Sequence, residues 1–305
     1  LGVEWVAPSV TSANYNERYS SCKTKSVERK LRNKTLNPAL DFVNLRHHGY
    51  VLIELNTSHA KSTWFKVKVN KPGKTKSKKF LVIGSYSTLT SEYRILNADT
   101  PFEDFKIFQP RVRGLEYSIS HYDDSFYVLT NMDGASNFKL MKTSDDTTLM
   151  DNWEEMIAHR EDVLLEDIDI FKDYYVISER SNGLNRIKVV KWDGTDSYYL
   201  PFDNETYTAF VSVNPEFDSK VLRYVYNSLI TPSSIIDFNM DTREQIILKE
   251  TEVLGTGFNK NNYESKRIWA AAADGTSIPV SMVYKKGMKM NGKTPLLLYA
   301  YGSYG

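Results

Sequence analysis

Two tyrosines near the end of the sequence carry side chains that could do chemistry. Tyr301 and Tyr304 stand in the stretch 299–305, which reads Tyr-Ala-Tyr-Gly-Ser-Tyr-Gly. A phenol held just beyond a strand can donate a hydrogen bond to the oxyanion that develops when a nucleophile attacks a carbonyl group. The alternative for Tyr301 is an aromatic ring that only packs against the next helix. Composition leaves both interpretations open.

A short apolar run precedes these tyrosines and must position them. Pro295 opens the run Leu296–Leu298, which predicts a strand buried on both faces, as in a parallel sheet. A Gly-rich loop directly after such a strand is where α/β sheets place ligands. In α/β-hydrolase domains, the loop after the third strand supplies oxyanion-hole donors. A hairpin is predicted just upstream, with strands over 267–270 and 278–284 around the turn Asp274-Gly275.

A repeat fills the middle of the chain. Short β-rich runs recur at 80–83, 126–129, 174–177 and 223–226, and the valines that mark them, Val82, Val128, Val176 and Val225, are 46, 48 and 49 residues apart. A second run follows each marker, at 93–96, 138–141, 186–189 and 235–238, and weaker strands flank most of these pairs. Tight hairpin turns are predicted at 133–136 and 181–184. Four short strands in each repeat predict β-propeller blades; a β-sandwich is the main rival.

Other candidate chemistry is sparse in the sequence. No Gly-x-Ser-x-Gly nucleophile elbow occurs. The histidines His47, His48, His59, His121 and His159 have no zinc-like spacing to further ligands, so we interpret them as structural and expect no metal or cofactor. The acidic run Glu161–Asp169 has two interpretations. It could attract cationic peptides to a pore, or its charges could keep further strands from pairing with the edge of a blade, and we favour the second.

The charges are distributed unevenly. Residues 1–80 hold 16 Lys and Arg against 5 acids, a balance of +11, and the remainder holds 23 against 33, a balance of −10. A basic arm for nucleic acid would suit the first part, but it lacks interleaved aromatic residues, so we expect no nucleic-acid partner. No apolar run is long enough to cross a membrane. The single cysteine, Cys22, and the absence of a signal-peptide pattern at the start predict a cytoplasmic protein.

Several longer strings resemble one enzyme family. They are Tyr263–Ala270, Asp274–Thr276 and Ile278–Lys285 near the end, and His159–Asp162, Ser178–Leu184, Asn214–Asp218, Leu222–Tyr224 and Ser228–Ser234 in the repeats. Together they resemble the prolyl oligopeptidase family of serine peptidases, in particular its oligopeptidase B branch, over roughly residues 65–305. The resemblance implies a seven-bladed propeller that caps an α/β-hydrolase domain and admits only short peptides. It also implies cleavage after Lys or Arg, so that short basic peptides are the expected substrates.

The resemblance assigns roles to the two tyrosines. Tyr301 matches the family's oxyanion-hole tyrosine, and Tyr304 matches the aromatic residue near the primary specificity pocket. Ala300 stands where the family usually has glycine. The family's Ser, Asp and His fall beyond Gly305, so we expect this chain alone to be inactive. The competing hypothesis is a non-catalytic propeller that serves as a binding module, or a gene remnant.

The sequence therefore predicts a mainly β protein in three parts. Residues 1–60 are an unassigned basic segment, residues 61–250 form about four of an expected seven propeller blades, and residues 251–305 begin an α/β-hydrolase peptidase domain.

Overall fold

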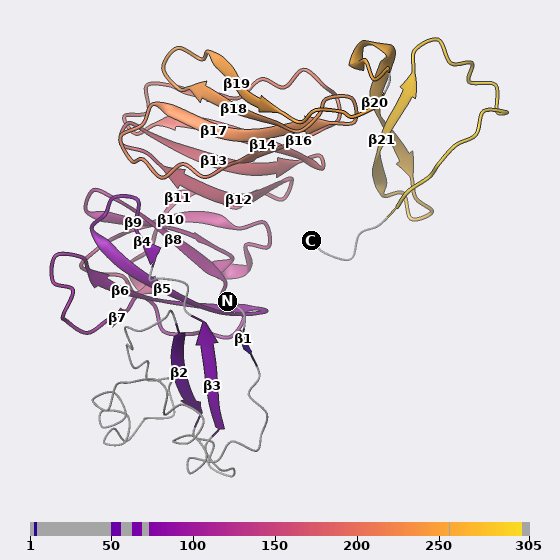
Figure 1. Cartoon of the computed structure of the whole chain (residues 1–305). Coiled ribbons are helices and arrows are strands. Elements are labelled where there is room, and N and C mark those ends of the chain that lie inside the picture. The colour runs from indigo at the N-terminus through magenta and orange to yellow at the C-terminus, as the bar shows by residue number, and fades with distance from the viewer. Residues whose placement is uncertain (1–2, 5–49, 56–62, 69–72, 256, 301–305) are drawn as a thin grey trace, which may run out of the picture. The chain divides into compact units, whose positions relative to one another are not determined.

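The computed structural model describes residues 3–4, 50–55, 63–68, 73–255 and 257–300 (Figure 1). The chain forms two compact units, residues 1–113 and 114–305. Strands dominate both units. Helices within the described ranges are single 3-10 turns: η1 (Met132–Gly134), η2 (Met150–Asn152) and η3 (Lys260–Asn262). The predicted mainly β class is confirmed. Most of the segment 1–60 lies outside the described residues.

The described residues of the first unit form two antiparallel sheets. One has three strands in the order β1-β3-β2, namely β1 (Val3–Glu4), β2 (Tyr50–Leu55) and β3 (Thr63–Lys68). The other is a four-stranded meander of β4 (Gly73–Lys74), β5 (Phe80–Ser87), β6 (Thr90–Asn97) and β7 (Lys106–Ile107). Its central pair, β5 and β6, is in register from Phe80↔Asn97 to Ser87↔Thr90.

The second unit holds three more four-stranded sheets, each with its strands in chain order. The first contains β8 (Tyr117–Tyr122), β9 (Ser125–Thr130), β10 (Lys139–Ser144) and β11 (Glu154–Ile157). The next contains β12 (Val163–Ile170), β13 (Tyr174–Ser181), β14 (Leu184–Lys191) and β15 (Ser197–Tyr199). The last contains β16 (Tyr207–Val211), β17 (Val221–Ser228), β18 (Ser234–Asn239) and β19 (Gln245–Glu250).

These sheets confirm the repeat read from the sequence. The four marker valines all fall in the second strand of a four-stranded sheet: β5, β9, β13 or β17. One period of the repeat is therefore one antiparallel meander, which is the blade of a β-propeller. A β-sandwich would not give four equal meanders along the chain. The fold is a partial propeller, with the four predicted blades present.

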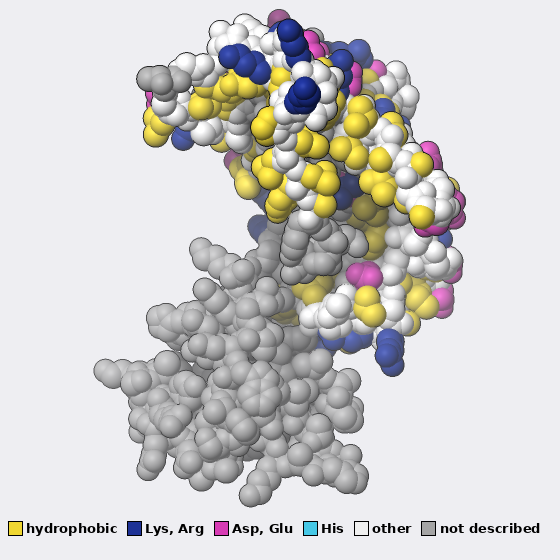
Figure 2. All heavy atoms as spheres, turned by 90° about the vertical axis from the view of Figure 1, so that its right-hand side faces the viewer, with side chains coloured by type: hydrophobic (Ala, Val, Ile, Leu, Met, Phe, Trp, Pro, Cys, Tyr) yellow, Lys and Arg dark blue, Asp and Glu magenta, His cyan; other side chains and the backbone are white. Residues whose placement is uncertain are grey.

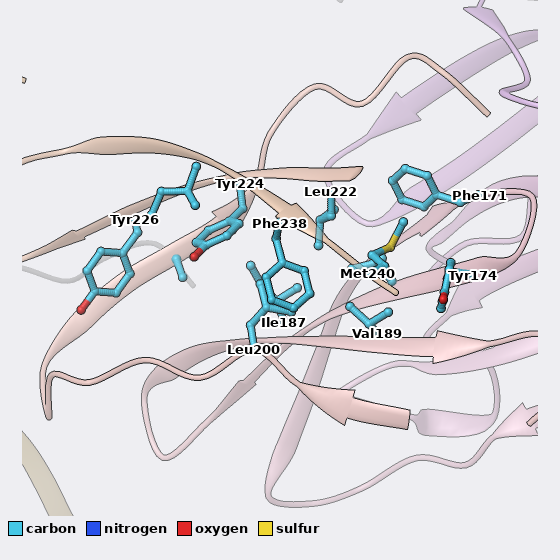
Figure 3. Close-up of a cluster of buried hydrophobic side chains, with 13 residues drawn as sticks. Phe171, Tyr174, Ile187, Val189, Leu200, Leu222, Tyr224, Tyr226, Phe238 and Met240 are labelled. Carbon is cyan, nitrogen blue, oxygen red and sulfur yellow. The ribbon is translucent and has the colours of Figure 1, made fainter. Parts of the chain in front are cut away.

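Neighbouring blades in the second unit pack through their apolar faces. Strand β17 alternates, with Leu222, Tyr224 and Tyr226 buried and Val221 and Arg223 exposed, because successive side chains of a strand point to opposite faces. The buried set meets side chains of the preceding sheet in one cluster (Figure 3), which comprises Phe171, Tyr174, Val176, Ile187, Val189, Leu200, Ala209, Leu222, Tyr224, Tyr226, Ile236, Phe238 and Met240. This shared core fixes the sheet β12–β15 against the sheet β16–β19.

The two predicted hairpin turns differ. Between β13 and β14, Asn182 and Gly183 both have positive φ, 51° and 68°, which is the two-residue type I′ turn expected. Between β9 and β10 the predicted tight turn forms, but it does not join the two strands directly. Asp133 and Gly134 both have positive φ, 56° and 76°, and the Ala135 N–H donates a hydrogen bond to the Met132 carbonyl at 3.3 Å. The whole connection is longer than the turn and runs over residues 131–138 through η1.

Candidate functional site

Tyr301 and Tyr304, the tyrosines with predicted catalytic and substrate-binding roles, lie outside the described residues. Their roles remain predictions. The described part of the same region consists of a hairpin and the segment that follows it. These elements would carry the tyrosine loop.

The hairpin is formed by β20 (Tyr263–Ala271) and β21 (Ser277–Lys285). The two strands pair along their full length, from Tyr263↔Lys285 to Ala271↔Ser277. In the turn, the Asp274 carboxylate accepts a hydrogen bond from the Thr276 N–H at 2.9 Å. Hydrogen bonds from Thr276 also lower the pKa of Asp274. The hairpin predicted around Asp274-Gly275 is confirmed.

One residue of this hairpin, Arg267, attaches it to the propeller. The Arg267 guanidinium donates a hydrogen bond to the Asn182 carbonyl in the β13–β14 turn. The Arg267 backbone N–H donates to the Glu205 carboxylate at 3.0 Å. Glu205 lies on the connection into β16. The hairpin is thus held at two points by the last two blades of the second unit.

The fit at the β13–β14 turn is close. A Cβ added to Gly183 would lie 2.7 Å from Nη2 of Arg267, nearer than real Cβ contacts come. On the hairpin side, the Arg267 guanidinium lies over the Trp269 ring, 5.4 Å from its centroid. The glycine therefore serves two purposes, since it adopts the positive φ of the turn and leaves room for the arginine.

The strand predicted at 296–298 is not formed in the structure. Leu296, Leu297 and Leu298 are 82%, 90% and 77% exposed and pair with no strand in the described part of the chain. A parallel strand needs hydrogen-bonded neighbours and covering helices, and every pairing among the described strands is antiparallel. Figure 2 shows hydrophobic side chains gathered over the hairpin and the segment after it.

A second polar cluster joins two of the motifs singled out in the sequence. Arg160, just after β11, forms an ion pair with Glu179 of β13. The Glu179 side chain is 2% exposed, and it also accepts a hydrogen bond from the Tyr199 hydroxyl at 2.8 Å. Burial opposes the charge on Arg160, but the hydrogen bond and charge of Glu179 outweigh it and raise the pKa of Arg160. Burial and Glu179 raise the pKa of Tyr199.

This cluster anchors the chain where it enters the strand β12. Arg160 makes a bridge to Val163, the first residue of β12. The acidic run follows on β12, which is an edge strand of its sheet and lies against β8, the first strand of the preceding blade. Glu166 forms an ion pair with Arg180 at 2.6 Å, at a register shift between Leu165 and Asp167. Charge and a bulge on an edge strand agree with a role against strand addition.

The two histidines of the described part each lie near one acidic residue, and His121 Nε2 is 3.6 Å from Oδ2 of Asp145. His121 is 2% exposed and lies edge-on to Phe126, with ring centroids 4.8 Å apart. His159 lies 3.9 Å from Glu161. Among the described residues there is no group of three His, Cys, Asp or Glu side chains that could hold a metal ion. His47, His48 and His59 lie outside them. No helix in the described part is long and apolar enough to cross a membrane.

Comparisons with known proteins agree with this architecture. Residues 63–251 match the sequence profile of the prolyl oligopeptidase N-terminal β-propeller domain. The chain is 40% identical over 234 residues to dipeptidyl aminopeptidase BI of Pseudoxanthomonas mexicana, covering 76% of this chain and 32% of that protein. It is 32% identical over 233 residues to protease 2 of Moraxella lacunata, covering 76% of this chain and 33% of that protein.

Solved structures show the same likeness. Oligopeptidase B from Leishmania major matches with a TM-score of 0.66 and 25% identity, over 82% of this chain and 39% of that chain. Oligopeptidase B from Trypanosoma brucei matches with a TM-score of 0.66 and 28% identity, over 79% of this chain and 36% of that chain. The chain belongs to the prolyl oligopeptidase family of peptidases. It spans about a third of the length of the curated relatives it matches.

Proposed function

We propose that this chain forms part of a cytoplasmic serine oligopeptidase that hydrolyses short peptides after Lys or Arg. Family membership supports the peptidase class. The observation that carries the proposal is the attachment of the hairpin β20–β21 to the propeller through Arg267. A propeller used only for binding has no need of this hairpin.

In the proposed mechanism the tyrosine loop supplies electrostatic stabilisation. The hydroxyl of Tyr301 donates a hydrogen bond to the oxyanion that forms when a serine attacks the scissile carbonyl. Tyr304 lines the pocket for the side chain before the scissile bond. The serine, aspartate and histidine of the triad are contributed from outside residues 1–305, and neither metal nor cofactor takes part.

The charge distribution supports a preference for basic peptides. Residues 81–305 carry 23 basic against 33 acidic side chains. Acidic side chains around an entry path raise the local concentration of cationic peptides, and this effect weakens as ionic strength rises.

Fluorogenic amides test the proposal in the peptidase that contains this segment. We expect an N-blocked arginyl amide to be cleaved well, and the matching prolyl and alanyl amides to be cleaved poorly. Tyr301→Phe should lower kcat by about 10²–10³-fold with little change in KM. The 305-residue chain alone should not release the fluorophore. Turnover unchanged in Tyr301→Phe would remove the oxyanion assignment, and preference for the prolyl amide would refute the basic specificity.

A second candidate activity follows from the relative of 40% identity, which is named a dipeptidyl aminopeptidase. Such an enzyme releases dipeptides from a free N-terminus. The same assay separates the two candidates when a free glycyl-arginyl amide is compared with its N-blocked form. Cleavage of the free form alone would favour dipeptide release over internal cleavage.

A further inference from the structure

A cavity lies beside the shared core of the last two blades. It has a volume of about 370 Å³ and opens between the sheet β16–β19, the segment 201–204 and the residues around η3. A volume of this size is in the range of small-molecule sites in proteins.

Aromatic rings form one wall of this cavity. Tyr224 and Tyr226 are 1% and 8% exposed, and the hydroxyl of Tyr226 points away from the rest of the core cluster (Figure 3). Phe202 stacks on Tyr226 with ring centroids 5.5 Å apart. Asn204 donates a hydrogen bond to the Tyr226 hydroxyl at 2.6 Å. These contacts hold the rings in place, so the wall is formed before any ligand arrives.

Charges of both signs surround the aromatic wall. Two acidic and two basic residues are among those that line the cavity: Asp203, Glu250, Lys260 and Lys286. Within the described residues none of these four makes an ion pair within 4.0 Å. The Glu250 carboxylate accepts a hydrogen bond from the Ser234 hydroxyl at 3.4 Å, and no ion pair joins the acids to the lysines of this lining. A ligand with a separated cation and anion could reach both pairs.

We propose that this cavity binds a short zwitterionic peptide. The free α-ammonium group pairs with the carboxylates of Asp203 and Glu250, and the free α-carboxylate pairs with Lys260 and Lys286. An apolar side chain of the peptide packs on the rings of Phe202 and Tyr226. A peptide carries its two charged ends farther apart than a single amino acid does, which suits a lining whose acids and lysines form no ion pair within 4.0 Å. This binding is independent of the proposed peptidase activity.

Calorimetric titration of the 305-residue chain tests the proposal. The probe is the tripeptide Ala-Phe-Ala, and the matched control is the same peptide acetylated at its N-terminus and amidated at its C-terminus. We expect saturable binding of the free peptide with Kd below about 10 mM, and binding of the capped peptide weaker by at least about tenfold. Equal affinities, or no saturable binding of the free peptide, would overturn the proposal.

Single substitutions then test which charged side chains bind the peptide. Asp203→Asn and Lys286→Met should each weaken binding of the free peptide by about three- to tenfold. Glu252→Gln and Lys285→Met are the matched controls, since both residues are exposed and neither lines the cavity. All four positions are exposed, so unchanged near-ultraviolet circular dichroism is expected throughout. Equal weakening by the control variants would refute the assignment. Because the readout is binding, its failure would not bear on the proposed peptidase activity.

Discussion

Replacement of Gly183 by alanine probes the contact that holds the hairpin to the propeller. Gly183 has φ +68°, and an added Cβ would lie 2.7 Å from Nη2 of Arg267. Gly194 is a matched control within the same sheet, because it has φ +72° and a Cβ there would meet nothing within 4 Å. Both substitutions strain the backbone. Only the first displaces a side chain.

The expected magnitudes follow from these two effects. An alanine at positive φ costs about 1–2 kcal/mol, so Gly194→Ala should lower the free energy of unfolding by that amount. At Gly183 the guanidinium is the flexible end of its side chain and can move. Its movement breaks the hydrogen bond from Arg267 to the Asn182 carbonyl, and a hydrogen bond to a charged group contributes about 1.5–3 kcal/mol. Gly183→Ala should therefore cost about 2.5–5 kcal/mol.

Urea denaturation followed by tryptophan fluorescence measures these free energies, and Trp269 beside Arg267 also reports on the hairpin. In an Arg267→Ala background the cost of Gly183→Ala should fall to that of Gly194→Ala, since the displaced group is gone. Equal costs for the two glycine substitutions in the unmodified chain would refute the reasoning. A double-mutant cycle with no coupling between Gly183 and Arg267 would refute it as well.

Three further predictions concern the blades. Leu222→Ala should lower the free energy of unfolding by about 2.7–5 kcal/mol in urea denaturation, because the side chain is 0% exposed in the shared core; a loss below 1 kcal/mol would contradict that packing. Arg160→Met should cost about 3–5 kcal/mol at neutral pH, because it leaves the buried Glu179 carboxylate without a counter-charge and with the Tyr199 hydroxyl as its remaining donor, and Glu179→Gln should recover part of that loss in the double variant. Burial raises the pKa of Tyr127 and Tyr224 to about 12. Because this folded pKa exceeds the unfolded value of about 10, the two neutral phenols contribute stability that is fully present below about pH 10. That contribution is lost as the pH rises from about 10 to 12. Measuring the free energy of unfolding across this pH range checks the prediction. Replacing both tyrosines by Phe should reduce the loss of that free energy by on the order of 2 kcal/mol per site.

Much of the fold could be predicted because its signals are local. Short runs rich in β-branched and aromatic residues predicted the strand positions, and the repeat of the marker valines predicted the four-stranded period. Asn182 and Gly183 specify their hairpin because both tolerate the positive φ of the turn, and Gly275 does the same in the hairpin turn that follows Asp274. Asp133-Gly134 also forms its turn, but the residues around it lengthen the connection between β9 and β10.

The strand at Leu296–Leu298 shows the limit of such local signals. An apolar run indicates that a segment is suited to burial. It does not provide the neighbouring strands and covering helices that a parallel strand requires. In the described structure these leucines have none and are exposed. The roles of Tyr301 and Tyr304 depend on the same surroundings, so they remain predictions.

The sequence by itself determined the class of blade, the number of recognisable repeats and the place where the hairpin turns. Only the tertiary structure decided which distant side chains meet. Arg267 lies 85 residues from Asn182 along the chain, and Arg160 lies 19 residues from Glu179. The residue types show which side chains are charged. Which of these side chains meet depends on how successive sheets pack on one another. That stacking is set by the shape of the whole buried core, and no local stretch of sequence contains it.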